Sequence, residues 1–446
     1  MQIEDLPDAQ RRLQEDLERT GDASYRARIE RLLDSGGDVT YADVLRDPDN
    51  IALNYRFAQT QIRQGNIRGA SATLERILLL DPQRPDVRLL YAVVLFRLDN
   101  LNDAERELLA VRDLPMRTEL RTEVDGLLDQ IGQRRKRLRA ELLVNFGVQY
   151  DWNGNIAQYS NTRLFSDTPV SLSDADERHR EFSTNGTVQM SADYDLGLNR
   201  RHKAVGLASA YRAEHLHEDQ LDLEAATGQA GLSLAYEPVT VEPKISYSKI
   251  RLAHQRYLTI ARFETLATWQ VTKMSALFVG AGVEDQHYNG LHVSTSAGDR
   301  RGGQTDLRLG GSTIADPTLK LGTYARVYDK DARERYNGYL RTEAGANATK
   351  VLSGGRFLIG SVVYQNDTYD AHDPFVSGAT RRDWSVRTRV LFGLPLANLF
   401  DEDIAGVLGG ITMSASAERY HQVSNLPDYT YRNNTFTLGL SRKWTF

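Results

Sequence analysis

Histidine and serine side chains that could do chemistry stand close together near the end of the chain. His421 precedes Ser424 by three residues, and Asn425 follows directly. Nucleophilic catalysis needs a base that a rigid element holds against its serine, whereas this stretch falls in a predicted surface loop beside Pro427. We therefore expect no catalytic residue here, and we expect that the chain is not an enzyme.

Two other polar stretches contain residue types that bind metal ions. His215, His217 and Glu218 offer zinc-type ligands, and the stretch from Ser173 to His179 is acidic. The first pattern is more typical of a solvated polar loop, and the second lacks the glycine and ligand spacing of a calcium loop. No glycine-rich phosphate loop precedes a predicted helix. We therefore expect no metal site and no cofactor.

The composition excludes several classes of protein. The 446 residues include 55 Lys and Arg against 60 Asp and Glu, so bulk positive charge cannot drive binding to nucleic acid. There is no cysteine, which excludes disulfides and thiol nucleophiles. The longest clean apolar run, YAVVLF, is far shorter than the roughly 18–20 residues of a membrane-spanning helix. A membrane β-barrel stays possible, because its strands alternate.

The spacing of apolar residues divides the chain into two parts. From about Leu6 to Leu138 they recur at the helical spacing, and after Glu141 they alternate as in a strand. We therefore predict an α-helical domain over residues 1–139 and an antiparallel β-domain over residues 140–446. Further helices are expected between residues 8 and 48.

Residues 51–84 resemble a tetratricopeptide repeat, which is a helix pair of about 34 residues. Gly65 stands at the turn between the helices, and Ala70 stands where they cross. Residues 85–118 keep the phase but lack the turn glycine, so this second repeat is degenerate. Such repeats form a concave groove that binds peptides or proteins. In this register the groove presents Tyr55, Gln59, Arg63 and Arg97, although ordinary solvated helix faces would look the same.

A basic cluster, QRRKRLR, ends the last predicted helix just before the first strand. Basic residues at this place are favoured by the helix dipole. A lipid-headgroup or nucleic-acid patch and a contact with the rim of a barrel are the alternatives.

Alternation in the second part is typical of a barrel that faces lipid. In LLVNFGVQYDW, residues 142–152, large apolar and aromatic residues occupy one face and polar residues the other. A soluble sandwich also alternates. However, long connections such as 153–181, 288–302, 366–381 and 420–431 alternate here with short turns, as in outer-membrane barrels. We predict a transmembrane antiparallel barrel of about 14 strands.

The end of the chain and two arginines add detail to this barrel. The last strand, TFTLGLSRKWTF, places Trp444 and Phe446 on its apolar face and resembles the C-terminal signal that the barrel-assembly machinery reads. Arg387 and Arg389 would line the lumen, where arginines either favour anions or pair with acidic neighbours. An even strand number places both barrel ends in the periplasm. Export is then required, so a signal peptide is expected to have been removed.

This layout is similar to that of the surface lipoprotein assembly modulator (Slam) family of Gram-negative outer membranes. The match is carried by the block LLLDPQRPDVRLLYAVVLFRLDNLNDAERELLAVRDLP, the basic stretch QRRKRLRAE and the strand LLVNFGVQYDWNGN. The resemblance implies an outer-membrane translocator that helps specific lipoproteins, or related soluble binding proteins, reach the cell surface. It also implies that the periplasmic helical domain meets this cargo and that outer-membrane lipid surrounds the barrel.

Two other functions stay open from the sequence. Exopolysaccharide export porins also join helical repeats to a barrel, but they usually carry more repeats and a basic or aromatic sugar track. A general diffusion porin with an accessory helical domain is the second alternative. Stacked aromatic residues in the lumen would favour the first, and a large, steady conductance without cargo would favour the second.

Overall fold

The computed structural model shows two compact units, a helical one that ends at Arg137 and a strand-built one that begins at Leu138. The change comes two residues before the predicted boundary between residues 139 and 140. The structure describes residues 39–64, 66–98, 100–113, 118–155, 157–160, 162–171, 178–197, 202–272, 274–291, 295–399 and 410–446. Gly65 and the helices expected between residues 8 and 38 lie outside these ranges.

The helical unit consists of successive antiparallel helices with local capping signals. Asn50 and Asn66 cap α3 and α4 by accepting hydrogen bonds from backbone N–H groups, and Pro85 begins α5, where its missing N–H costs nothing. Among the described residues, no helix combines the length and the apolar character needed to cross a membrane. The helices are α2 (Tyr41–Arg46), α3 (Ile51–Arg63), α4 (Ile67–Leu80), α5 (Pro85–Arg97), α6 (Leu101–Arg112) and α7 (Thr118–Arg135).

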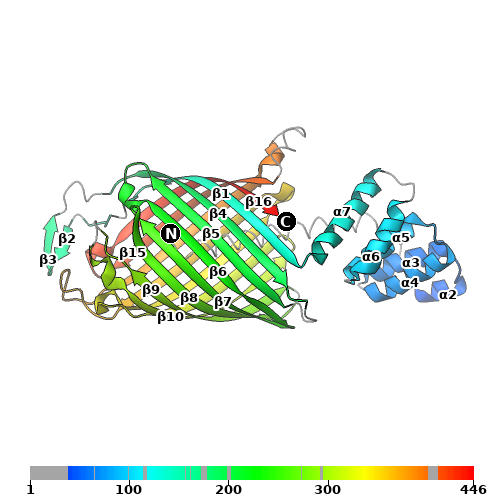
Figure 1. The fold of residues 1–446 in the computed structure, drawn as a ribbon, viewed down its shortest axis with the longest axis horizontal. Helices are drawn as coiled ribbons and strands as arrows, with labels where there is room; N and C mark the ends of the chain where they lie inside the picture. Colours follow the sequence, from blue (N-terminus) through cyan, green and yellow to red (C-terminus); the bar gives the residue numbers. More distant parts are fainter. Residues whose placement is uncertain are drawn as a thin grey trace. The chain divides into compact units, whose positions relative to one another are not determined.

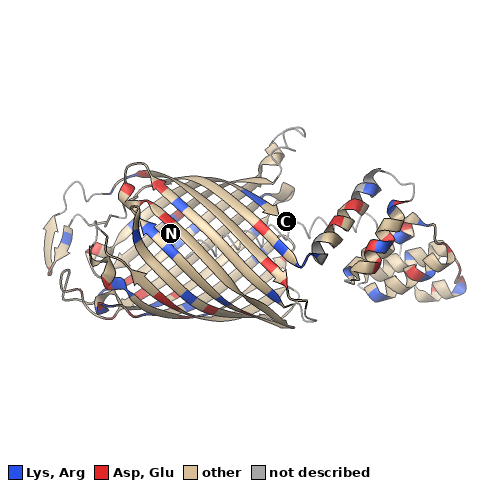
Figure 2. Ribbon diagram, viewed as in Figure 1, with Lys and Arg blue, Asp and Glu red and all other residues tan. Residues whose placement is uncertain are grey.

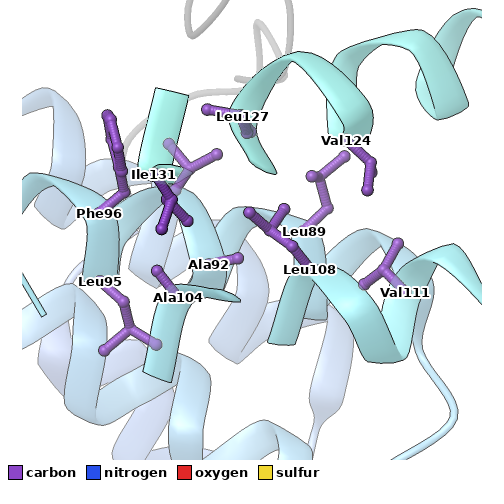
Figure 3. Close-up of a cluster of buried hydrophobic side chains, with 11 residues drawn as sticks. Leu89, Ala92, Leu95, Phe96, Ala104, Leu108, Val111, Val124, Leu127 and Ile131 are labelled. Atoms are coloured by element: carbon purple, nitrogen blue, oxygen red, sulfur yellow. The ribbon is translucent and has the colours of Figure 1, made fainter. Parts of the chain in front are cut away.

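Helix α5 lies at the centre of the helical unit. Its Val87, Leu90 and Val94 join one buried cluster with α3 and α4. Other side chains of α5, among them Leu89 and Phe96, join a second cluster with α6 and α7 (Figure 3). The run YAVVLF is therefore apolar on all sides because α5 is covered on both sides. The second repeat folds as a helix pair although its turn glycine is absent.

The second unit is a closed antiparallel barrel of 14 strands (Figure 1). Each strand pairs with its neighbours, and β1 pairs with β16 to close the ring. The barrel strands are β1 (Leu138–Asp151), β4 (Glu181–Asp195), β5 (Lys203–His215), β6 (Leu223–Tyr236), β7 (Val239–Leu252), β8 (Gln255–Gln270), β9 (Ser275–Tyr288), β10 (Gly302–Asp316), β11 (Leu319–Lys330), β12 (Tyr339–Val351), β13 (Phe357–Tyr369), β14 (Arg382–Pro395), β15 (Ile411–Ser424) and β16 (Tyr431–Thr445). The predicted strand number is confirmed.

Connections at the two ends of the barrel differ in length, with exceptions. The longest one joins β1 to β4 and contains a separate hairpin of β2 (Thr162–Phe165) and β3 (Thr168–Ser171). The end of the barrel that carries this connection is called the long-loop end, and the opposite end is called the short-turn end. Residues 396–410, between β14 and β15, form a long connection at the short-turn end, which the predicted alternation did not include.

The predicted long loop over residues 420–431 is wrong. Strand β15 continues to Ser424, and Gln422 pairs with Tyr431 of β16, which leaves only residues 425–430 as the connection. The polar residues of this stretch occupy inward-facing positions of the strands. The prediction failed because a run of polar residues is also typical of a loop.

Candidate functional site: the interior of the barrel

Side chains of the barrel are sorted by strand alternation into an apolar exterior and a polar interior. On β4, Val188 and Met190 are 48% and 53% exposed, whereas Gln189 between them is 2% exposed. On β16, Phe436, Leu438 and Leu440 are all exposed, and the residues between them are less so. In Figure 2, uncharged positions predominate along the middle of the barrel strands. The barrel is therefore built inside out relative to a soluble protein.

Charged side chains that face inward from β8 to β14 form what we call the charged wall. The Arg262 guanidinium lies 2.7 Å from a carboxylate oxygen of Glu284 and 2.7 Å from one of Asp306. Arg326 binds the same Asp306 carboxylate at 3.1 Å. Gly282 leaves the room for this cluster, because a Cβ atom there would meet both Arg262 and Asp306. The arginines are held by acidic neighbours on adjacent strands.

Tyrosine rings accompany these arginines along the charged wall toward the long-loop end. Arg341 makes two hydrogen bonds with Asp367, of 2.8 and 2.9 Å, and its guanidinium lies 4.7 Å from the ring centre of Tyr339. Arg381 lies 4.4 Å from the ring centre of Tyr369 and 3.5 Å from that of Tyr429. Planar guanidinium groups stack on aromatic faces in this way. The charged wall thus presents alternating cations, carboxylates and phenol rings.

Both predicted lumen arginines lie on the inward face of β14. They alternate with the exposed Trp384, Thr388 and Val390 of the exterior. The Arg387 guanidinium lies 3.5 Å from a Glu418 carboxylate oxygen and 5.0 Å from the ring centre of Tyr420. Arg389 pairs with Glu418 in the strand register. Of the two alternatives for these arginines, favouring anions or pairing with acidic neighbours, Arg387 shows the pairing.

The inward side chains of β16, β1 and β4 are mostly uncharged, in contrast to the charged wall, and we call them the amide wall. Between the two strand ends these are mostly Asn, Gln, Ser, Thr and Gly. Asp151, near the long-loop end, accepts hydrogen bonds from Gln149, Asn433 and Thr435, of 2.7, 2.7 and 2.6 Å. This wall offers neutral donors and acceptors, so the interior is chemically two-sided.

Carboxylates organise the loops at the long-loop end. Buried Glu181 accepts the backbone N–H groups of Leu216 and His217, at 2.6 and 2.9 Å, and so holds the connection after β5. In the turn of the β2–β3 hairpin, Asp167 accepts hydrogen bonds from Ser377 and from the backbone of Gly378. The hydrogen bond from Ser377 is the main reason that the pKa of Asp167 lies below its ordinary value. The hairpin is thereby fastened to the connection between β13 and β14.

The C-terminal strand completes the ring as the sequence predicted it would. Phe446 donates its backbone N–H to the carbonyl of Ala140 at 2.9 Å, which closes the ladder between β16 and β1. Trp444 has the outward register of Leu438 and Leu440, and the guanidinium of outward Arg442 lies 5.1 Å from its ring centre. Recognition of Trp444 and Phe446 by the assembly machinery stays a prediction.

The predicted cargo groove of the helical unit is only partly open. Arg63 and Arg97 are exposed at the ends of α3 and α5. Tyr55 packs partly against the buried cluster of α3, α4 and α5. Gln59 is 2% exposed, so the expectation that it lines the groove is wrong. The helical period places Gln59 one turn after Tyr55 on α3, but its side chain is buried.

The histidine, serine and glutamate residues that the sequence offered for catalysis or metal binding do not meet at one site in the structure. His421 lies within β15 and not in a loop, which corrects the prediction. It faces outward against Trp384, at 5.6 Å between ring centres, whereas Ser424 has the opposite register. His215, His217 and Glu218 each contact a different partner, namely Asp222, Glu181 and His179. Within the described residues no group of three such side chains is arranged to hold a metal ion.

Sequence reasoning missed the tyrosines and most arginines of the charged wall. A signal was present in the stretch YARVYDK, residues 324–330, where tyrosine and cationic residues recur at every second position. That spacing identifies one face of a strand. Which face is inward, and which strands are neighbours, depends on ring closure.

Comparisons with known proteins found one family model and several solved structures of low similarity. The tetratricopeptide repeat family model matches residues 41–85. A loop-deletion mutant of the outer membrane protein OmpT of Vibrio cholerae has 7% identity and a TM-score of 0.40, and the alignment covers 69% of this chain and 100% of that one. OccAB3 of Acinetobacter baumannii has 8% identity and a TM-score of 0.34, with 69% and 99% covered.

For the helical unit, the type III secretion chaperone SycD of Yersinia enterocolitica, solved with a peptide of the translocator YopD, has 16% identity and a TM-score of 0.21. The alignment covers 29% of this chain and 96% of that one. No curated protein matches the chain. The similarity scores are too low to carry a functional argument. The fold itself defines the class: a tetratricopeptide-like helical region followed by a closed 14-stranded antiparallel barrel.

Proposed function

We propose that this chain is an outer-membrane translocator that assists the export of specific lipoproteins, or related soluble binding proteins, to the cell surface. The observation that carries the proposal is the direct fusion of a repeat unit to the barrel. Helix α7 ends at Arg135 and β1 begins at Leu138, so cargo bound by the helices is tethered to the barrel entrance. An effective concentration set by so short a connection favours handover.

The topology supports a periplasmic helical unit. Strand β1 begins at the short-turn end, where β16 also finishes and where Phe446 pairs with Ala140. In outer-membrane barrels the short turns face the periplasm. The apolar exterior supports insertion in the membrane, because exposed side chains such as Leu438 and Val188 would be unfavourable in water. The barrel-assembly machinery is the expected partner for insertion.

A surface-display assay tests the translocator proposal. The full chain is expressed in a Gram-negative host together with each lipoprotein or small secreted protein encoded beside its gene, and intact cells are probed with antibody. We expect at least one such protein to reach the surface only when the barrel is present. Deletion of residues 1–137 should abolish display while the barrel still inserts. Display that is independent of the barrel for every neighbour would refute the proposal.

Exposed positions of the helical unit allow a finer test. Arg63→Glu and Arg97→Glu reverse charge at the two exposed groove positions, and Arg46→Glu is the matched control on α2, where the side chain is 82% exposed. We expect the groove variants to reduce display and the control to leave it unchanged. Equal display by all three variants would show that the groove does not take part in export.

A second candidate function, export of a polysaccharide, is favoured by the charged wall. Tyrosine rings such as Tyr339 and Tyr369 stack against arginines inside the barrel, and the amide wall offers hydrogen-bonding groups that suit sugar hydroxyls. Tyr339→Ala would then reduce passage of oligosaccharides into vesicles that contain the protein. The control is Tyr364→Ala, because Tyr364 lies on the exterior. Unchanged passage in both variants would exclude this candidate.

A further inference from the structure

Two arginines stand on the outer surface of the barrel near the long-loop end. Arg419 on β15 and Arg432 on β16 are exposed and share the outward register of Ala417 and Phe436. In the ladder, Arg432 is directly opposite His421, and Arg419 is opposite Asn434. Diagonal neighbours in an antiparallel pair are about 7–8 Å apart, within reach of long side chains. Both guanidinium groups can therefore approach one ligand.

These two arginines have no acidic partner among the described residues. In the described part of the chain, no ion pair joins Arg419 or Arg432 to a carboxylate. The outward positions of β13, β14, β15, β16, β1 and β4 contain neither Asp nor Glu. We call Arg419 and Arg432 the outer arginine cluster. It is a net positive patch on the exterior.

Two outward arginines on the other side of the barrel have acidic partners. Arg212 pairs with Glu214 on β5, and Arg251 of β7 lies 3.1 Å from Glu224 of β6. These pairs occupy the same long-loop third of their strands. The outer arginine cluster differs from these two pairs in having no ion pair with a described carboxylate, which favours an external counter-ion.

Aromatic residues place the cluster at a membrane interface. Trp384 contacts His421 edge to face, and the Arg432 guanidinium lies 4.0 Å from the ring centre of Tyr159. Trp152 donates its backbone N–H to Asn434, the residue opposite Arg419, at 3.1 Å. Tryptophan and tyrosine concentrate at the level of lipid headgroups. Phosphate groups of lipids lie at this same level.

We propose that the outer arginine cluster binds the phosphate group of an anionic acylated lipid in the leaflet that borders the long loops. Two guanidinium groups form charge-assisted, bidentate hydrogen bonds with phosphate oxygens, a geometry that lysine does not reproduce. The exposed apolar residues below the cluster, such as Val390 and Phe436, contact the acyl chains. This inference rests on the proposed membrane location but not on the proposed cargo.

The test compares the full-length chain with a double variant, Arg419→Gln and Arg432→Gln, in phosphatidylcholine vesicles with and without lipid A. The control is Arg442→Gln, which removes an outward arginine from the same β16 strand near its short-turn end. The midpoint of thermal unfolding is measured from the strand signal in circular dichroism, because a ligand that binds only the folded state raises it. Affinity is read from the dependence on lipid A content.

We expect lipid A to raise the unfolding midpoint of the wild type and of Arg442→Gln. The double variant should bind lipid A about tenfold more weakly or worse, as expected for loss of hydrogen bonds between charged groups. In pure phosphatidylcholine all three should unfold alike, which shows that the double variant folds. Equal responses to lipid A in the wild type and the double variant would overturn the site.

Two further outcomes separate the alternatives. If inorganic phosphate stabilises the wild type as well as lipid A does, the cluster is a soluble-anion site and the lipid proposal is overturned. If the wild type fails to insert into either vesicle, the membrane location itself is wrong. Cargo display can be measured independently of both results, so a failure of the lipid site leaves the translocator proposal standing.

Discussion

The helical unit and the barrel place the same residue types in opposite positions. In the helical unit Leu74, Leu90 and Leu108 are at most 1% exposed, whereas Leu307, Leu309 and Leu438 on the barrel are 45–58% exposed. The hydrophobic effect is the same in both, but the surroundings differ: one surface meets water and the other is proposed to meet lipid. A single leucine therefore does not show whether its position is buried or exposed. The pattern of its neighbours does, at a spacing of two residues in a strand and of three to four residues in a helix.

The largest expected effect comes from a charge in the helical core. Leu108→Asp leaves a buried unpaired charge and a cavity next to Leu89 and Val111, so it should destabilise the helical unit by about 5 kcal/mol. The loss of helical circular dichroism at a lower denaturant concentration measures this effect. Leu109→Asp, at a neighbouring position that is 37% exposed, should change stability by only about 0.5 kcal/mol. Equal effects would mean that the repeat packs differently.

Inside the barrel, the next largest effect is expected from Arg341→Ala. The change leaves the Asp367 carboxylate, which is 4% exposed, without its bidentate partner. Breaking such a pair costs about 3–5 kcal/mol. The heat-dependent shift in electrophoretic mobility of the folded barrel reports this loss. Adding Asp367→Asn should restore part of the stability, and no recovery in the double variant would show that the pair is not coupled.

On the exterior of the barrel, Leu438→Arg should be unfavourable only if lipid covers this face. The residue lies near the middle of β16, where an arginine costs about 2–4 kcal/mol in a membrane barrel. Thr437→Arg faces inward from the adjacent position and should cost much less. Both are measured by unfolding in phospholipid vesicles. A Leu438→Arg variant as stable as the wild type would contradict the inside-out arrangement.

The smallest effect concerns the hairpin at the long-loop end and depends on pH. Because the pKa of Asp167 is lowered in the folded protein, its contribution is complete above the ordinary value of 3.8 and is lost as the pH falls through the lower folded value. We expect faster proteolysis of the β2–β3 hairpin in that acidic range. Asp167→Asn keeps a residue that accepts the positive φ of 65° and should remove the pH dependence. Persistence of the dependence in this variant would assign it to another group.

Much of the fold could be predicted from the sequence because periodicity is a local property. The repeat signal in residues 51–84 and the alternation from Val144 onward are each visible within a window of a few residues. The strand number followed from counting such windows. The exact end of β15 did not, since the polar inward residues Tyr420 and Gln422 have the composition of a loop until their partners on β16 are known.

The sequence by itself determined the two periods, the absence of thiol chemistry and the apolar face of each strand. Only the tertiary structure decided that Gln59 is buried, that His421 and Ser424 face opposite sides, and that arginines from several strands meet acidic partners in the charged wall. The physical reason is that a single strand sets which residues share a face, whereas ring closure sets which strands are neighbours. Charge pairing and burial depend on those neighbours.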